Sequence, residues 1–227
     1  MHPVKTLLTV LVGLMFCCPP PQAMGGQEEI DEVRQATEVF RLFTRVPEYQ
    51  IPPMLLRNAE AIAIIPGTIT LGFMVAGRYG HGIMIGRDEQ GEWGLPFFVN
   101  LLAGSLGWQF GLQATDTVLV FKNRKGLYHI RNGKFMLGGD AAVAAGPIGR
   151  RTEAATDIQL KSAIYSYSMS RGLYVGVSLE GAVLQADKIA TENLYGREAA
   201  AISRETIQVP PAVQEFYSAI DQYTSRR

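Results

Sequence analysis

The segment LGGDAAVAAGPIGRRTEAATDIQLKSAIYSYSMSRGLYVGVSLEGAVL, residues Leu137–Leu184, decides the fold class. Glycines and small residues fill its first third, as is typical of turns. Apolar and polar residues then alternate along Ile158–Tyr165 and again along Leu173–Leu179, which predicts two strands. Arg171-Gly172 stands between them as a two-residue hairpin turn would. The segment therefore predicts a tightly turned antiparallel sheet, with backbones or a ligand close to its glycines.

Composition limits the classes of function. The chain has 227 residues, 47% of them hydrophobic and 19% charged, which suits one sizeable globular domain. Its 24 glycines and 12 prolines favour many short elements over long helices. The formal charge is zero, so we expect no nucleic-acid binding and no bulk attraction to anionic membranes. Any binding of anions must come from a local patch.

The first 25 residues are predicted to be a signal peptide. Leu7–Phe16 forms a short apolar region, and Ala23-Met24-Gly25 fits a cleavage site before Gly26, with cleavage after Ala23 as the alternative. Lipoprotein anchoring through Cys17 or Cys18 is disfavoured, because Phe16 stands where lipoprotein processing needs a small residue. Both cysteines lie in this segment. The secreted form would therefore have no disulfide, thiolate metal site or cysteine nucleophile.

Gln27–Val46 is predicted to be an amphipathic helix, because its apolar residues recur at steps of three and four. It could pack on the sheet. Alternatively, it could lie on a membrane with Phe40 and Phe43 inserted and Arg41 and Arg45 at the head groups. The acidic first half favours packing on the sheet, but the pattern leaves both arrangements open.

The rest of the chain predicts an α+β fold: a mainly antiparallel sheet or barrel-like β core with flanking N- and C-terminal helices. Pro66-Gly67 and Arg131-Asn132-Gly133 are predicted to be turns, and the former argues against a membrane span. The expected strands are Ala61–Ile65, Thr70–Ala76, Gly82–Gly86, Pro96–Asn100, Ser105–Gly111, Thr115–Phe121, Leu127–Ile130 and Lys134–Leu137. Further helices are expected at Pro53–Asn58, Asp187–Tyr195 and Ala212–Tyr223.

Four segments follow from this pattern. They are a signal peptide (1–25), the N-terminal amphipathic helix (26–50), a β-rich domain (51–196), and a connector with the C-terminal helix (197–227).

No catalytic signature is found. The sequence lacks the histidine spacing of zinc enzymes and phosphate-binding glycine fingerprints, so no metal, cofactor or enzyme activity is expected. Ala103–Gly107 comes nearest to a nucleophile elbow but begins with alanine where glycine is needed. Glu153 and Asp157 are either an acid–base pair or a surface ion-pair cluster with Arg150 and Arg151. The same glycine-rich loop, with its two arginines, could hold an anion such as a phosphate head group.

Six blocks, taken in order, resemble the SYLF domain, a lipid-binding module. It occurs in bacterial envelope proteins and in eukaryotic adaptors that link phosphoinositide membranes to actin. The blocks are LLRNAEAIAIIP (Leu55–Pro66), AGRYGHGIMIGR (Ala76–Arg87), GWQFGLQATDTVLVF (Gly107–Phe121), LGGDAAVAAGPIGR (Leu137–Arg150), AIYSYSMSRGLYVGVSLEGAVL (Ala163–Leu184) and NLYG (Asn193–Gly196).

The resemblance implies a non-enzymatic domain that binds acidic phospholipids, with the N-terminal helix and basic surface residues as contacts. The signal peptide makes phosphoinositides and actin unexpected partners, so we expect a bacterial periplasmic protein that binds anionic phospholipid at an envelope membrane. The candidate lipid contacts are Phe40, Arg41, Phe43, Arg45, Arg78, Arg87, Lys122, Arg124, Lys125, Arg150 and Arg151.

Two other interpretations remain. The chain could be a structural or protein-interaction module of the envelope, with an envelope protein as partner and no dependence on lipid. A hydrolase using Asp157, Glu153 or His81 has the least support.

Overall fold

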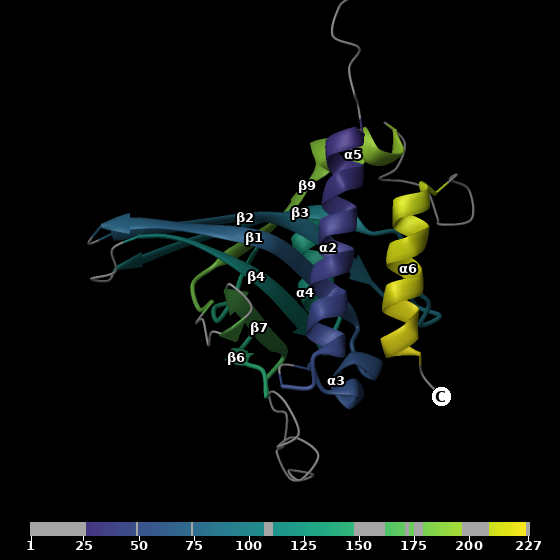
Figure 1. Cartoon of the computed structure of the whole chain (residues 1–227), viewed down its shortest axis with the longest axis horizontal. Coiled ribbons are helices and arrows are strands. Elements are labelled where there is room, and N and C mark those ends of the chain that lie inside the picture. Colours follow the sequence, from purple (N-terminus) through teal and green to yellow (C-terminus); the bar gives the residue numbers. More distant parts are fainter. Residues whose placement is uncertain are drawn as a thin grey trace, which may run out of the picture.

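A computed structural model describes residues 26–48, 50–73, 75–106, 111–147, 162–170, 173–174, 179–196 and 209–225. These residues form a nine-stranded sheet in the order β5-β9-β3-β2-β1-β4-β7-β6, with β8 paired to β7 (Figure 1). The strands are β1 (Ala61–Phe73), β2 (Val75–Gly86), β3 (Phe97–Leu106), β4 (Gly111–Phe121), β5 (Lys134–Met136), β6 (Val143–Ala145), β7 (Ile164–Ser170), β8 (Leu173–Tyr174) and β9 (Val183–Asp187). Among these pairs only β6–β7 is parallel, so the predicted fold class is confirmed.

The described residues form five helices, and four of them lie where the sequence predicted a helix. The helices are α2 (Gln27–Arg45), α3 (Pro53–Arg57), α4 (Lys125–Asn132), α5 (Lys188–Tyr195) and α6 (Pro211–Thr224). Figure 1 shows α2 and α6 side by side across one end of the sheet, with α2 running roughly perpendicular to the strands. Proline starts α3 and α6 in the first turn, where its missing N–H is not needed. The Asp187 side chain caps α5 by accepting from the Ala190 N–H.

Pro66-Gly67 does not form the predicted turn. It lies inside β1, where one extra residue shifts the register against both β2 and β4. Such a bulge bends the strand and changes which side chains share a face. Gly67 supplies the positive φ of 53°, and its N–H donates to Asp116 Oδ1 at 2.8 Å. The predicted strand Thr70–Ala76 is therefore wrong, because Phe73 already pairs with Val75 across the reversal from β1 to β2.

Two further strand predictions are corrected. Leu127–Ile130 belongs to helix α4, and its buried residues Leu127 and Ile130 are three apart, which is a helical spacing. Ser105 belongs to β3 beside β2, whereas Gly111 begins β4 beside β1, so the two residues lie in different strands. The predicted hairpin around Arg171-Gly172 is supported by the pairing of Ser170 with Leu173. The two turn residues themselves lie outside the described part.

Each face of the sheet has its own apolar core. On one face, α2 and α6 pack on strand residues that include Ile62, Ile64, Ile83 and Val118. On the other face, Leu127 and Ile130 of α4 pack with Phe135, Leu137 and the alternate strand residues. This two-sided burial explains why β1 reads as an almost continuous apolar run from Ala61 to Ile65.

Gly82 tests the tight packing between β1 and β2. A Cβ at this position would lie 2.2 Å from the Ile64 carbonyl oxygen, which belongs to the backbone and cannot turn aside. We expect Gly82→Ala to lower the free energy of unfolding by about 1–3 kcal/mol in urea denaturation. Gly104→Ala is the matched control in β3, since nothing lies within 4 Å of its Cβ position. Equal stability of the two variants would contradict this packing.

Candidate functional site

The two aromatic residues predicted to contact lipid are buried in the protein core. Phe40 and Phe43 are both 0% exposed and pack in the cluster beneath α2. Phe40 also makes an edge-on contact with Tyr223 of α6. The sheet-packing alternative for α2 is therefore the one that the structure contains. While α2 is packed on the sheet, neither Phe40 nor Phe43 is accessible to a membrane.

The two arginines at the end of α2 differ in their surroundings. Arg41 Nη1 bonds Glu38 at 2.9 Å and Glu215 of α6 at 2.8 Å, and the bond to Glu215 raises the pKa of Arg41. Arg41 thus joins the two helices. Arg45 is exposed at the last turn, where a cation suits the helix dipole.

Arg87 was predicted as a surface contact, but it is only 7% exposed. Its guanidinium donates to the carbonyl oxygens of Ala59, Gly91 and Thr224 and lies 4.1 Å from the Trp93 ring centroid. It therefore fixes the C-terminal end of α6 to the sheet, and the surface-contact prediction is corrected. Arg78 is half-buried, and its Nε donates to Thr70 Oγ1 at 3.2 Å.

Lys122, Arg124 and Lys125 lie together between the end of β4 and the first turn of α4. Arg124 Nε bonds Glu60 Oε2 at 3.2 Å, which ties this basic segment to the chain entering β1. Arg57 ends α3 three residues before Glu60, and it is exposed. We call Arg57, Lys122, Arg124 and Lys125 the basic end. Arg150 and Arg151, together with Glu153 and Asp157, lie outside the described residues.

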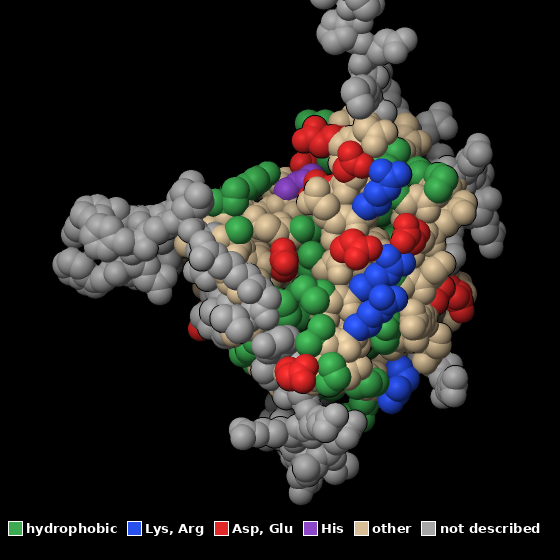
Figure 2. All heavy atoms as spheres, in the orientation of Figure 1, with side chains coloured by type: hydrophobic (Ala, Val, Ile, Leu, Met, Phe, Trp, Pro, Cys, Tyr) green, Lys and Arg blue, Asp and Glu red, His purple; other side chains and the backbone are tan. Residues whose placement is uncertain are grey.

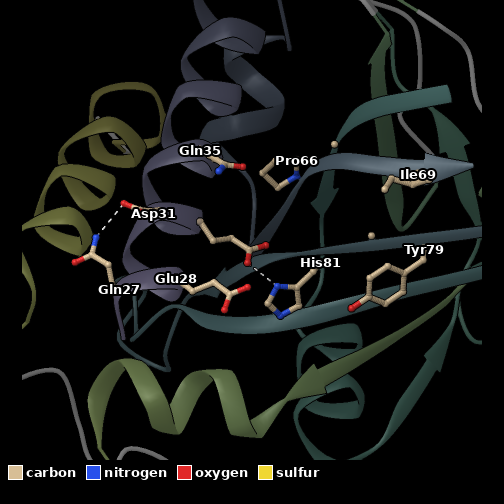
Figure 3. A pocket seen from close by; sticks show the side chains of 11 residues that line it. Gln27, Glu28, Asp31, Gln35, Pro66, Ile69, Tyr79 and His81 are labelled. Atoms are coloured by element: carbon tan, nitrogen blue, oxygen red, sulfur yellow. Dashed lines mark hydrogen bonds and ion pairs between the residues drawn. The ribbon is translucent and has the colours of Figure 1, made fainter. Parts of the chain in front are cut away.

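A groove of about 630 Å³ opens between the first half of α2 and strands β1 and β2 (Figure 3). Acidic and amide side chains of α2 form one wall, and Pro66, Ile69 and Tyr79 lie on the sheet side. Acids are favoured here because they stand in the first turns of α2, near the positive end of its dipole. The lining residues are Gln27, Glu28, Asp31, Glu32, Gln35, Pro66, Gly67, Ile69, Tyr79, Gly80 and His81.

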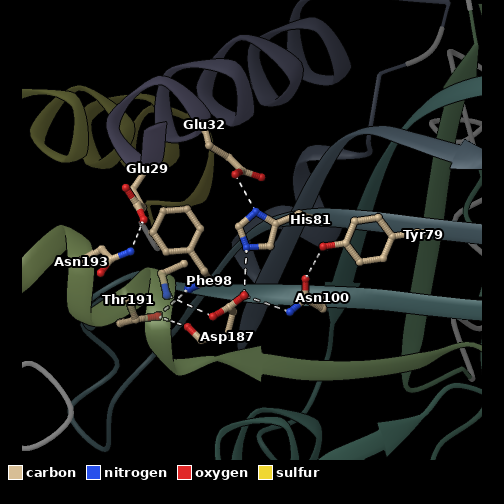
Figure 4. A network of polar contacts seen from close by, with 10 residues as sticks. Glu29, Glu32, Tyr79, His81, Phe98, Asn100, Asp187, Thr191 and Asn193 are labelled. Carbon is tan, nitrogen blue, oxygen red and sulfur yellow. Dashed lines mark hydrogen bonds and ion pairs between the residues drawn. The ribbon is translucent and has the colours of Figure 1, made fainter. Parts of the chain in front are cut away.

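His81 joins α2 to the sheet at the edge of this groove (Figure 4). Its Nδ1 lies 2.6 Å from Glu32 Oε2, and its ring stacks on Phe98 with the centroids 5.4 Å apart. Its Nε2 lies 3.5 Å from Asp187 Oδ2, an ion-pair distance without a hydrogen bond. The hydrogen bond to Glu32 raises the pKa of His81; burial opposes it, and the charges of Glu32, Asp187 and Glu28 add to the increase.

Asp187 connects the same network to α5. Burial pushes the pKa of Asp187 up, but the Ala190 N–H, the Asn100 amide and the charge of His81 outweigh it, so the pKa lies below its ordinary value. Asn100 Nδ2 donates to Asp187 Oδ2 at 3.0 Å, and its Oδ1 accepts from the Tyr79 hydroxyl at 3.0 Å. A chain of polar contacts thus runs from α2 through β2 and β3 to α5.

The network favours a structural role over catalysis. Its described members are already bonded to one another, and none is a serine or cysteine placed to be activated by His81. In the described part of the chain, no three His, Cys, Asp or Glu side chains are arranged to hold a metal ion. The helices of that part include none with the length and hydropathy needed to cross a membrane.

The face that carries the helices shows both kinds of charge. Figure 2 shows acidic side chains beside the histidine near the start of α2, and a line of basic side chains along the helix layer with further acidic side chains next to them. Sequence analysis found the acids and the basic residues, but no local pattern signals the contact between His81 and Glu32, which are 49 residues apart. Only the packing of α2 across β2 brings them together.

Comparison with known proteins defines the class of this protein. Residues 102–223 match the Ysc84 family, described as a Las17-binding protein actin regulator. This match covers more than half of the chain, so the chain belongs to the Ysc84 family, and the predicted SYLF resemblance is confirmed at that level.

Three relatives illustrate the match. The chain is 31% identical over 204 residues to SH3 domain-containing YSC84-like protein 1 of Xenopus laevis, covering 86% of this chain and 61% of the relative. It is 32% identical over 200 residues to Protein YSC84 of Saccharomyces cerevisiae, covering 84% and 42%. The human SH3 domain-containing YSC84-like protein 1 is 29% identical over 203 residues, covering 86% and 59%. The chain therefore spans about half the length of these relatives.

His81 predicts a pH-dependent contribution to stability. Because its folded pKa is raised above the ordinary value of 6.5, the contact with Glu32 stabilises the fold fully below pH 6.5. That contribution is lost as the pH rises through the folded pKa. We expect His81→Gln to lower the free energy of unfolding by about 1 kcal/mol at pH 6, with a smaller difference at pH 8.5. The measurement is urea denaturation at both pH values.

The control is His129→Gln, which removes an exposed histidine of α4. A difference between wild type and His81→Gln that stays constant between pH 6 and 8.5 would show that the charge of His81 contributes nothing.

Proposed function

We propose that this protein is a non-enzymatic lipid-binding protein of the cell envelope, which binds anionic phospholipid head groups through its basic end. Membership of the Ysc84 family and the resemblance to the lipid-binding SYLF domain support lipid as the ligand. The signal-peptide pattern of residues 1–25 supports secretion, with the bacterial periplasm as the proposed location.

The proposal places the lipid-binding surface at the basic end because cations cluster there. Lys122 and Lys125 are three residues apart around the start of α4, with Arg124 between them. Arg124 bonds Glu60, which follows Arg57 by three residues. Met54, in the same short helix as Arg57, is 57% exposed and could enter the apolar boundary of a bilayer. Cations beside an exposed apolar side chain suit an anionic membrane surface.

The acidic groove at the other end argues for a defined orientation. Glu28, Asp31 and Glu32 would be repelled by anionic head groups, so the start of α2 faces away from the membrane. The predicted contacts at Lys122, Arg124 and Lys125 remain in this proposal. Phe40, Phe43 and Arg87 leave it because they are buried.

Co-sedimentation with vesicles tests the proposal, using protein that begins at Gly26. We expect binding to vesicles containing an anionic phospholipid and none to neutral vesicles, with loss of binding at high salt. Each lysine near an anionic surface contributes about 1 kcal/mol, so Lys122→Gln with Lys125→Gln should weaken binding roughly 30-fold.

Lys134→Gln with Lys188→Gln is the matched control, since it neutralises two exposed lysines elsewhere. Equal loss in both double variants would mean that only overall charge matters. Binding to neutral vesicles alone, or to neither kind, would contradict the proposal.

A further inference from the structure

Apolar residues, five of them exposed and Val183 half-buried, form one row across six strands. The pairing registers place Ala114 opposite Ile69, Ile69 opposite Tyr79, and Tyr79 opposite Leu102. They continue the row from Leu102 to Val183 and from Val183 to Met136. Directly paired residues share a face of the sheet, so all six lie on the same side. We call Ala114, Ile69, Tyr79, Leu102, Val183 and Met136 the apolar row.

The row is open to solvent. Ile69 is 43% exposed, Tyr79 52%, Leu102 45% and Met136 47%. Adjacent strands are about 4.8 Å apart, so six strands give a row about 24 Å long. A continuous apolar strip of this length is unusual on a protein surface and marks an interaction site more often than chance exposure does.

The apolar row lies on the helix-covered face, beside α2. His81 and Tyr79 are two residues apart in β2, so they point to the same face, and His81 contacts Glu32 of α2. In Figure 1, α6 flanks α2 on one side, and the strands extend beyond its other side, where none of the described helices lies next to α2. The row runs across the strands, as α2 does. A helix of about 16 residues could therefore lie over it, next to α2.

The neighbouring wall defines the charge of that helix. Glu28, Asp31 and Glu32 line the groove whose sheet side is formed by Ile69 and Tyr79, so the apolar row and the acids share one hollow (Figure 3). Arg34 Nη1 forms an ion pair with Asp31 Oδ1 at 2.8 Å, and His81 pairs with Glu32. Glu28 adds a third negative charge, so the wall remains acidic. Lys134 lies at the far end, two residues from Met136. Positive charge is therefore favoured near Tyr79 and disfavoured near Met136.

We propose that the apolar row and the acidic wall of α2 form a docking site for an amphipathic helix of a protein partner, with Lys or Arg along the edge that faces α2. Such a helix would add a third member to the α6–α2 layer and cover the exposed part of the sheet. It would bind on a different surface from the basic end, so the protein could hold lipid and partner together.

The test measures the fluorescence anisotropy of two labelled 18-residue peptides added to the full-length chain. In one peptide, Leu residues at steps of three and four form one face of the helix and Lys residues form the other. The second peptide has Glu in place of every Lys. We expect the Leu/Lys peptide to bind at least tenfold more tightly. Ile69→Thr with Leu102→Thr should weaken its binding tenfold or more by removing apolar contact. Glu28→Gln with Asp31→Asn should weaken it to a similar extent and reduce its salt dependence.

Matched controls change exposed residues elsewhere: Met54→Gln with Ile189→Gln for the apolar row, and Glu89→Gln with Asp221→Asn for the acids. Both should leave peptide binding unchanged, and so should Lys122→Gln with Lys125→Gln, whose effect on vesicles tests the lipid site separately. The docking proposal is wrong if both peptides bind equally, or if the row variants bind as wild type does. It is equally wrong if the row variants lose anionic-vesicle binding, or if they convert a dimer into a monomer on size-exclusion chromatography.

Discussion

The burial of the apolar stripe of α2 against the sheet is the interaction on which the rest of the structure depends. Phe40 and Phe43 alone, fully removed from water, stabilise the packed arrangement by about 3–6 kcal/mol. That is comparable with the whole stability of a typical domain, so α2 does not leave the sheet without a large compensating gain. The same packing aligns α6 through Arg41 and Glu215. It also brings Glu32 to His81.

The packing of α2 on the sheet also fixes where its charged side chains lie on the protein surface. Its acidic first turns stand over β2, and its basic last turn lies at the end where α3 begins. Lys122, Arg124 and Lys125 are found with Arg57, where Glu60 connects the two segments. A chain with zero formal charge thus has an acidic groove and a separate basic end. A neutral total therefore excludes neither an anionic nor a cationic ligand, because binding depends on local charge.

The bulge at Pro66-Gly67 is the second constraint with wide consequences. Without the extra residue in β1, Ile69 would point to the opposite face from Ile64, because side chains alternate along a strand. The bulge places Ile69 on the helix side, directly opposite Tyr79. The apolar row beside α2 therefore depends on a backbone irregularity. Its sequence signal, Pro followed by Gly, equally suits a turn, and sequence analysis interpreted it as one.

The sequence by itself determined several of the local elements. The three- and four-residue spacing of α2 and the prolines that start α3 and α6 follow from rules that act within about ten residues. Motif order was enough to predict the family. Only the tertiary structure decided which of the charged residues stay on the surface and which are buried or paired with distant residues. The burial of Arg87 by Trp93 and Thr224 is one example, and the contact of His81 with Glu32 and Asp187 is another. These contacts join distant segments, and their geometry is created by strand register and helix docking, which no short stretch of sequence encodes.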